Sequence, residues 1–424
     1  MTQDPQLGIR TDAFIGADDK RTENAARRGD SDLVRPGKRK SDLGEVNTRF
    51  FTFADRKNPF VFRTGETLAP VTLAYETYGS LNSTKSNAIL LFHALSGSQH
   101  AAGINRRVKG VGRLWTDEMH VGWWDDFIGP GKALDTERYF IVCANYIGGC
   151  YGSSGPPSRN PATGKPYGRA FPTVMIGDIV DSQVRLLDHL GIAQLHAVVG
   201  ASLGGLCANN FAVRYPDRVR IVITIGSGIE VSILQRIYNY EQICAIEEDK
   251  YFNGGHYYGR KRPDRGLALA RMISHKTFVS LEMMADRART EVVRPEEDRD
   301  KWYWMSHPVE SYLRNQGLKF VKRFDANTYL RIIDAWQRFD LLKDTGKSSF
   351  EEVFSVCRNQ RHLVFTIEGD ACFEPAQQAQ QCAVLRKARV PHEHITVHSD
   401  KGHDSFLLEP NLYTPHLAYF LRAR

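Results

Sequence analysis

One short segment of the chain combines a serine with residues of minimal bulk. From Gly200 to Gly204 it reads Gly-Ala-Ser-Leu-Gly, which fits the pattern Gly-x-Ser-x-Gly. A serine held in a strained turn between a strand and a helix needs very small neighbours two positions away on each side. The N-terminus of the following helix favours developing negative charge. The pattern predicts that Ser202 is a nucleophile for acyl chemistry; the alternative is a glycine-rich turn in which Ser202 only caps the helix.

A serine hydroxyl becomes a good nucleophile only beside a base, and the base needs an acid that orients it. Behind a nucleophile turn of this kind, the carboxylate and then the histidine follow later in the chain. Asp370 comes directly after a predicted strand, and His403 comes directly after the last one. Glu368 and His398 compete with them but fall within predicted strands, and Asp400 and Asp404, which flank His403, lack the strand-end position of Asp370. We therefore expect Ser202, Asp370 and His403 to form a catalytic triad.

Acyl chemistry on a serine also needs N–H groups that stabilise the oxyanion. The backbone N–H of Leu203, the residue after the nucleophile, is expected to supply one. The second is expected from the backbone of Leu95, in the loop "FHALSGSQH" that follows an early strand. His93 in the same loop is interpreted as a structural histidine rather than a catalytic one.

These residues lie far apart in the sequence, so the fold must bring them to one place. Apolar runs typical of buried strands alternate with segments of helical periodicity, which indicates a mostly parallel sheet with helices on both faces. The carboxyl ends of parallel strands share one edge of the sheet, where the predicted triad would meet. The predicted strands are residues 71–79, 87–95, 139–147, 195–200, 220–228, 362–369 and 394–399.

Between residues 231 and 342 the alternation stops and the sequence is mostly helical. We interpret this tract as a helical cap inserted into an α/β core that consists of residues 46–230 and 343–424. Residues 1–45 are polar and charged and are predicted to form a disordered tail.

The composition argues against several other classes of protein. The net charge is +7, but no long basic block lies within the body of the chain, so nucleic-acid binding is not favoured. No apolar run reaches the roughly 18 residues of a membrane span, and the N-terminus lacks the apolar core of a signal peptide. The seven cysteines are scattered, and neither zinc-ligand spacing nor a nucleotide-binding loop occurs. We therefore expect a cytoplasmic enzyme for small molecules, without a metal or a bound cofactor.

Further segments are distinctive in their composition and order. They are "LAYETYGSLN", "HALSGSQHAAG", the loop from residue 123 to 168 with "GGCYGSSGP" and "NPATGKPYG", "FPTVMIGDIV", "GASLGG", "VESYLRNQGLKFVKRFDANTYL" and "GHDSFLLEP". Together they resemble the homoserine O-acetyltransferase family of the α/β-hydrolase superfamily. The resemblance extends over roughly residues 60 to 424.

The resemblance implies a ping-pong acyl transfer in methionine biosynthesis. Ser202 would take an acetyl or succinyl group from acyl-CoA, which is a substrate rather than a bound cofactor. His403 would act as base and then as acid, and Asp370 would orient it. Asp404 matches a family aspartate that binds the amino group of the acceptor. The resemblance also implies a homodimer formed through the helical cap.

Two positions depart from the family pattern. Ile243, in the segment "NYEQICAI", stands where the family has an arginine that binds the carboxylate of the acceptor, and isoleucine cannot make that pair. Arg236 and Lys276 are nearby alternatives. Gly177 stands where the family commonly has arginine. The acceptor is therefore less well defined than the triad.

Three functions are compatible with these residues. The first is an acyl-CoA-dependent O-acyltransferase that acts on homoserine or a related hydroxyl compound. The second is a serine esterase or thioesterase of the same fold, with water or a different alcohol as acceptor. The third is a non-catalytic binding protein, which the complete set of triad residues argues against.

Overall fold

The computed structural model describes residues 41–291, 302–303 and 305–422. Residues 1–40 of the predicted tail lie outside these ranges. Residues 41–45 pack on the rest of the fold: Ser41 Oγ donates to Asp125 at 2.5 Å, and the backbone of Glu45 pairs with Ile104. The folded part thus begins before residue 46, because polar and backbone groups find partners there that hydropathy does not reveal.

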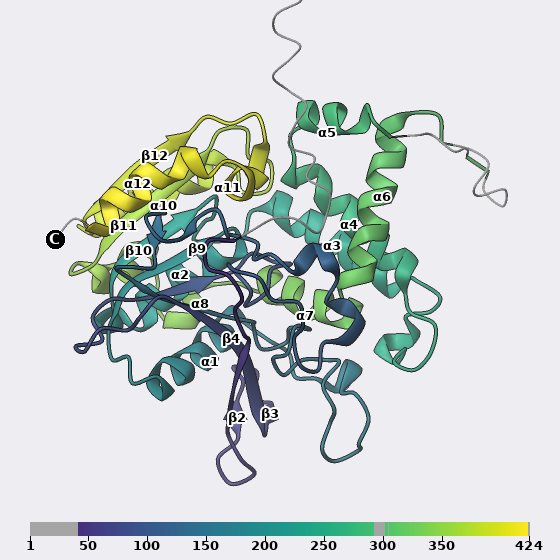
Figure 1. Ribbon diagram of the computed structural model, residues 1–424, viewed down its shortest axis with the longest axis horizontal. Helices are drawn as coiled ribbons and strands as arrows, with labels where there is room; N and C mark the ends of the chain where they lie inside the picture. The colour runs from purple at the N-terminus through teal and green to yellow at the C-terminus, as the bar shows by residue number, and fades with distance from the viewer. Residues whose placement is uncertain (1–40, 292–301, 304, 423–424) are drawn as a thin grey trace, which may run out of the picture. The chain divides into compact units, whose positions relative to one another are not determined.

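An eight-stranded sheet forms the centre of the described chain, in the order β1-β4-β8-β5-β9-β10-β11-β12 (Figure 1). The six strands from β8 to β12 in this order run parallel, and β4 is antiparallel to both of its neighbours. This confirms the predicted mostly parallel sheet. The strands are β1 (Arg49–Phe53), β4 (Val71–Tyr78), β5 (Ala88–Phe92), β8 (Phe140–Ala144), β9 (Leu195–Ala201), β10 (Val219–Ile225), β11 (Arg361–Ile367) and β12 (His392–Val397).

Two short strand pairs lie outside this sheet. They are β2 (Phe60–Val61) with β3 (Thr67–Leu68), and β6 (Ile128–Gly129) with β7 (Leu134–Asp135).

The central strands are apolar on both faces because helices or loops cover both. Every residue of β5 and of β8 is buried. Leu90 contributes to the core on one face, whereas Ile89 and Leu91 contribute to the core on the other. A strand of this kind appears in the sequence as an unbroken apolar run, which is why these strands could be predicted.

Helices on the two faces of the sheet come from different parts of the chain. One face is covered by α1 (Ile176–His189), α2 (Leu203–Arg214) and α10 (Pro375–Lys387). The C-terminal helix α12 (Pro410–Arg422) covers the other face, where Tyr413 contacts the ring of Phe365 at 5.4 Å between centroids. The α/β arrangement was predicted from the alternation of strand-type and helix-type segments.

The described residues between 231 and 342 fold mainly into helices, which we call the cap. They are α3 (Ile233–Glu247), α4 (Asp264–Phe278), α5 (Leu281–Ala288), α6 (Pro308–Arg323), α7 (Ala326–Gln337) and the start of α8 (Leu341–Thr345). Helix α4 packs against both α3 and α6 (Figure 1). Two short helices, α9 (Phe350–Phe354) and α11 (Ser405–Leu408), belong to the later core segment.

The cap contacts the loops that follow β11 and β12. Trp336 of α7 stacks on Phe373 with centroids 5.2 Å apart, and Gln235 Nε2 of α3 donates to the carbonyl of Cys372 at 2.8 Å. The cap therefore lies beside the carboxyl edge of the sheet, where the predicted triad residues emerge. None of the described helices is long and apolar enough to cross a membrane.

Candidate active site

Ser202 occupies the turn between β9 and α2 with a strained backbone. Its φ is 58° and its ψ is −130°, a conformation that costs a non-glycine residue about 1–3 kcal/mol. Its N–H donates to the carbonyl of Ile225 at 2.9 Å, and its own carbonyl accepts from the N–H of Gly205 at 2.9 Å. The side chain makes no capping hydrogen bond to α2, whose residues are all described. The geometry is that of an elbow that presents its hydroxyl, not of a capped helix.

The glycines around Ser202 leave room for this turn. A Cβ added to Gly200 would lie 2.0 Å from the carbonyl oxygen of Gly204, and one added to Gly204 would lie 2.3 Å from the carbonyl oxygen of Phe92. Both obstacles are backbone atoms, which cannot move aside as a flexible side chain can. The same packing places the first turn of α2 against the end of β5.

Asp370 and His403 meet in a buried hydrogen bond. Asp370 Oδ2 lies 2.7 Å from His403 Nδ1, and Asp370 Oδ1 accepts the N–H groups of Cys372 and Phe373, each at 2.8 Å. Both oxygens of the Asp370 carboxylate thus have hydrogen-bond partners. The carboxylate orients the imidazole of His403 so that Nε2 points away from Asp370. Gly226 connects this pair to the elbow: an added Cβ would lie 3.1 Å from Asp370 Oδ2, and the preceding residue, Ile225, accepts the N–H of Ser202.

Aromatic rings surround the imidazole of His403. Phe278, Phe373 and Phe406 have ring centroids within 6.0 Å, 5.7 Å and 5.3 Å of it. The Nε2 atom of His403 is buried and has no hydrogen-bond partner among the described residues. A buried polar atom without a partner is costly in a folded protein. The structure brings Ser202 and His403 to the same edge of the sheet but forms no hydrogen bond between Ser202 and His403 Nε2.

The pKa of His403 is raised above 6.5, its ordinary value. Burial acts to lower it, but the charge of Asp370, the hydrogen bond to Asp370 and the charge of Asp404 together outweigh burial. The environment therefore stabilises the imidazolium that forms when His403 accepts a proton.

The competing residues Glu368 and His398 pair with each other instead. His398 Nδ1 lies 2.5 Å from Glu368 Oε2, and the two side chains are 75% and 65% exposed. Both residues come just after their strands, not within them as expected. An exposed pair of this kind is strongly solvated, so the structure favours Asp370 and His403.

The loop after β5 approaches the elbow. Leu95 is buried, and within the described residues we find no acceptor for its N–H. The N–H of Gly97 donates to the carbonyl of Ala94 at 3.0 Å and closes a tight turn around Leu95. His93 is buried and stacks on Tyr146 at 3.7 Å, and burial lowers its pKa to about 4. A neutral, packed histidine fits the structural role predicted for it.

Asp404, next to the predicted base, is close to two arginines. Burial raises its pKa, while the charges of His403, Arg271 and Arg287 lower it by a smaller amount. Arg271 of α4 lies over the ring of Phe278 at 5.2 Å, and Phe278 in turn contacts His403. A carboxylate and a guanidinium are therefore both present on the cap side of His403.

The position that departs from the family pattern in α3 does not face this region. Ile243 packs on the core and lines a surface cavity of about 650 Å³ with Arg169, Arg331 and Arg338. The predicted substitutes are engaged elsewhere: Arg236 donates to the carbonyl of Gln337 at 2.8 Å, and Lys276 is 3.9 Å from Glu241.

Gly177 has a direct structural explanation. A Cβ at this position would lie 2.2 Å from Nε of Arg63, whose guanidinium reaches Asp181 at 3.5 Å and Asp344 at 3.8 Å. The side chain of Arg63 thus occupies the space above Gly177, and a larger residue at 177 would displace it.

A cleft of about 330 Å³ opens beside the loop after β5. Three cations from the cap line it: Arg271 of α4, and Lys319 and Arg323 of α6. Arg323 also donates to the carbonyl of Ser96 at 3.1 Å, which joins the cap to the loop that carries Leu95. Within the described residues, no group of three His, Cys, Asp or Glu side chains could hold a metal ion.

Comparison with known proteins places this chain in a family. A family model described as "alpha/beta hydrolase fold" matches residues 87–410. A homoserine O-acetyltransferase from Solidesulfovibrio magneticus is 40% identical over 385 residues, which make up 90% of this chain and 94% of that protein. The chain belongs to the homoserine O-acetyltransferase family. It is an acyltransferase, and the predicted α/β-hydrolase fold is confirmed.

Solved structures agree with this assignment. A homoserine O-acetyltransferase from Bacillus anthracis superimposes with a TM-score of 0.79 at 28% identity, and covers 89% of this chain and 98% of that one. Esterase E22 also has a TM-score of 0.79, at 27% identity, and covers 89% of this chain and 100% of that one. The homoserine O-acetyltransferase architecture is thus shared with an esterase, so the choice of acyl acceptor depends on local residues.

Two contributors to the site were not found from the sequence. Gly226 has a φ of 49° and lies against the Asp370–His403 pair, and Arg271 reaches the cleft from two turns before Phe278. A signal for Gly226 was present, since a glycine at the end of a buried strand often marks a close approach of backbone. No sequence signal distinguished Arg271 from the other arginines of the cap.

The Gly200→Ala variant tests the elbow. The added methyl group must push the backbone of Gly204 away, so we expect the protein to lose about 1–3 kcal/mol of unfolding free energy. Displacement of Ser202 should slow its acylation by about 100-fold or more. Urea unfolding and the burst of p-nitrophenol from p-nitrophenyl acetate measure the two effects. An unchanged burst rate would show that the close approach is not needed.

The raised pKa of His403 predicts how acylation depends on pH. The base must be neutral to accept the proton of Ser202, so the acylation rate should rise with pH through a midpoint above 6.5. The Asp404→Asn variant removes a negative charge that stabilises the imidazolium, and should lower that midpoint without abolishing acylation. The rate of p-nitrophenyl acetate acylation, measured as a function of pH, checks both. A midpoint below 6.5 in the unaltered protein would contradict the assignment of His403 as base.

Proposed function

We propose that this protein transfers an acetyl group from acetyl-CoA to the hydroxyl of homoserine through an acyl-Ser202 intermediate. The observation that carries the proposal is the buried Asp370–His403 pair, whose Nε2 atom has no partner among the described residues, beside a serine at positive φ. The relatives named homoserine O-acetyltransferase support the choice of acceptor.

The first half-reaction acylates the serine. Ser202 Oγ attacks the thioester carbonyl while His403 Nε2 takes the hydroxyl proton, and the N–H groups of Leu95 and Leu203 donate to the oxyanion. The carbon–sulfur bond then breaks, and the coenzyme A thiolate receives the proton from His403. Asp370 holds the imidazole in the orientation that both transfers need.

The second half-reaction frees the enzyme. The hydroxyl of the acceptor gives its proton to His403 Nε2 and attacks the acyl-Ser202 carbonyl. The ester bond to Ser202 breaks, Ser202 Oγ regains a proton from the imidazolium, and the O-acetyl product leaves. Both steps use the same base and the same oxyanion donors, as ping-pong chemistry requires.

The cationic cleft supports an acyl-CoA donor. Lys319 and Arg323 of α6 line it, and ammonium and guanidinium groups suit the phosphates of coenzyme A. The names of the relatives favour an acetyl group over a succinyl group as the group transferred.

For the acceptor, Asp404 is the proposed site of the amino group and Arg271 the proposed site of the carboxylate. We assign the carboxylate to Arg271 because this residue lines the cleft and interacts electrostatically with Asp404. Ile243, at the position of the family arginine, lines a different cavity together with Arg169 and Arg331. An ammonium group beside a carboxylate and a carboxylate beside a guanidinium are the pairings that these charges favour.

Hydrolysis is the second candidate function. The likeness to esterase E22 favours it, because water can replace homoserine once Ser202 is acylated. The two functions share the acyl-enzyme and differ only in what removes the acyl group.

Intact mass spectrometry and coenzyme A release test the proposal together. Acetyl-CoA alone should add one acetyl group to the protein, and the Ser202→Ala variant should gain none and lose about four orders of magnitude or more in turnover. Homoserine should then accelerate coenzyme A release, whereas serine should do so less. Release that is equally fast with and without homoserine would favour the esterase, and absence of an acetylated protein would overturn the acyl-enzyme.

We also propose that the protein forms a homodimer through α3. Three side chains of this helix, Ile233, Ile237 and Tyr240, are 74%, 49% and 63% exposed, and they follow the spacing of one helix face. An exposed apolar stripe on a cap helix matches the dimer that the family resemblance implies. A cytoplasmic location also stays a prediction; the seven unpaired cysteines suit it.

The Ile237→Lys variant tests the dimer. A charge placed in the centre of the stripe should shift the protein from dimer to monomer, measured by light scattering on a size-exclusion column. Val61→Lys is the matched control, because Val61 is 61% exposed on β2, outside the cap. A monomeric unaltered protein, or a dimer that tolerates Ile237→Lys, would contradict this interface.

A further inference from the structure

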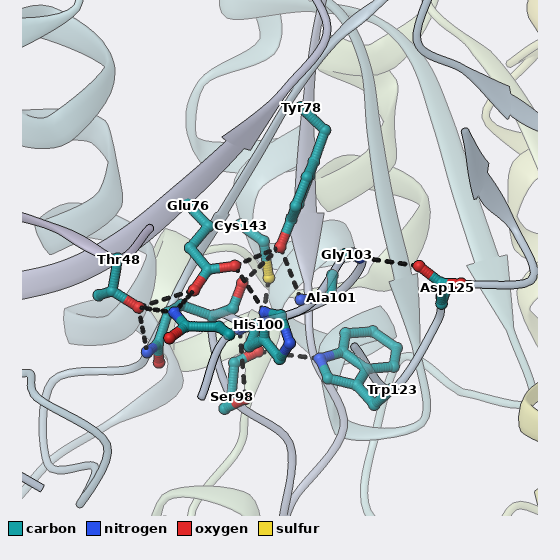
Figure 2. Close-up of polar contacts among 12 residues, drawn as sticks. Thr48, Glu76, Tyr78, Ser98, His100, Ala101, Gly103, Trp123, Asp125 and Cys143 are labelled. Atoms are coloured by element: carbon teal, nitrogen blue, oxygen red, sulfur yellow. Dashed lines mark hydrogen bonds and ion pairs between the residues drawn. The ribbon is translucent and has the colours of Figure 1, made fainter. Parts of the chain in front are cut away.

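A second buried histidine–carboxylate pair lies behind the loop that carries Leu95. Glu76 of β4 and His100 are each 1% exposed at the side chain, and Glu76 Oε2 lies 2.8 Å from His100 Nδ1. Figure 2 shows the carboxylate of Glu76 among His100, Tyr78 and Thr48. The chemistry described above uses neither residue.

Both oxygens of Glu76 are fully engaged. Oε1 accepts from Thr48 Oγ1 at 2.7 Å and from Asn105 Nδ2 at 2.8 Å. Oε2 accepts from the hydroxyl of Tyr78 at 2.8 Å, in addition to its contact with His100. A buried carboxylate with four partners is fixed in one position, and it fixes its partners in turn.

The hydrogen bonds of His100 determine where its protons lie. Nε2 lies 3.1 Å from the carbonyl oxygen of His120, which can only accept, so Nε2 carries a proton. The contact between Nδ1 and Glu76 needs one further proton, which the two groups share. Two hydrogen bonds thus join β4, through His100, to the segment around His120.

This network holds one side of the loop after β5. Gln99 Nε2 donates to Thr48 Oγ1 at 3.1 Å, and the N–H of Ala101 donates to the hydroxyl of Tyr78 at 2.8 Å. The carbonyl of Ser98 accepts from Trp123 Nε1 at 2.9 Å (Figure 2). Residues 98 to 101 are therefore fixed by side chains from β4 and from segments on either side of the loop.

The other side of the loop is held by different contacts. Tyr146 donates to the carbonyl of His93, and Arg323 donates to the carbonyl of Ser96. Leu95 lies within this second set, between His93 and Ser96, and the network of Glu76 and His100 holds the segment that begins three residues later. Since Ser98 and His100 also line the cationic cleft, the same loop shapes the donor site and presents the proposed oxyanion N–H.

We propose that Glu76 and His100 are positioning residues, which place the N–H of Leu95 for the oxyanion. The inference rests on the proposed function, because it takes Ser202 as the nucleophile and Leu95 as an oxyanion donor. Loss of the pair would leave Ser202, Asp370 and His403 in place and would misplace one donor.

The Glu76→Gln variant is the conservative member of the test series. Its amide oxygen can still accept from Thr48 and Asn105, and its amide nitrogen can donate to His100 Nδ1 and to the hydroxyl oxygen of Tyr78. His100 would keep its proton on Nε2 for the carbonyl of His120. Every hydrogen bond of the network can thus be satisfied without the charge, so we expect turnover within about threefold of the unaltered protein.

The Glu76→Ala and Tyr78→Phe variants are the disruptive members. We expect the first to lower kcat for p-nitrophenyl acetate by about 10- to 100-fold and the second by a smaller factor, with little change in KM. Rates are expressed per site titrated with a fluorophosphonate, which counts only molecules with a reactive Ser202. Tyr215→Phe is the matched control, since Tyr215 donates to Asp181 at 2.6 Å between α1 and α2.

The outcomes separate the explanations. A reduced kcat per titrated site in Glu76→Ala and Tyr78→Phe, restored in Glu76→Gln and absent in Tyr215→Phe, supports positioning. An unchanged kcat per titrated site, with only a lower melting temperature, would overturn it and leave a purely structural network. If Glu76→Ala does not fold, Tyr78→Phe decides between the two. If the unaltered protein does not react with the fluorophosphonate, the assignment of Ser202 has failed instead.

Discussion

The strained backbone of Ser202 is the constraint on which the rest of the site depends. A positive φ at a serine persists only where the surrounding structure imposes it, and here the carbonyls of Phe92 and Gly204 approach so closely that only glycine fits at positions 204 and 200. The hydrogen bond from Ser202 to Ile225 ties the turn to β10. The parallel strands thus hold the turn in place, and the other groups of the site are positioned relative to Ser202.

Much of this arrangement could be predicted because it depends on local pattern and chain order. Buried parallel strands appear as unbroken apolar runs, and the turn of Ser202 requires its glycines. Asp370 and His403 were identified because they follow strands in the expected order. The same reasoning misplaced Glu368 and His398 within strands, since the ends of β11 and β12 depend on hydrogen bonds between neighbouring strands that a sequence does not display.

What could not be predicted depends on contacts between segments far apart in the chain. The guanidinium of Arg271 reaches the cleft because α4 packs between α3 and α6, and no periodicity fixes how these helices rotate against one another. The rotation of α3 in this packing also determines that Ile243 lies away from Asp404. The space above Gly177 is filled by Arg63, more than one hundred residues earlier in the chain. Buried polar networks such as that of Glu76 are equally invisible, because their members look like ordinary polar residues until the fold unites them.

The contacts between the cap and the base couple access to the site with its chemistry. Phe278 at the end of α4 touches the ring of His403, and Ser280, two residues later, donates to the carbonyl of Asp400 in the loop that leads to His403. A movement of α4 that widened the cleft would therefore also disturb the imidazole. The position of α4 therefore sets both the width of the cleft and the surroundings of the imidazole.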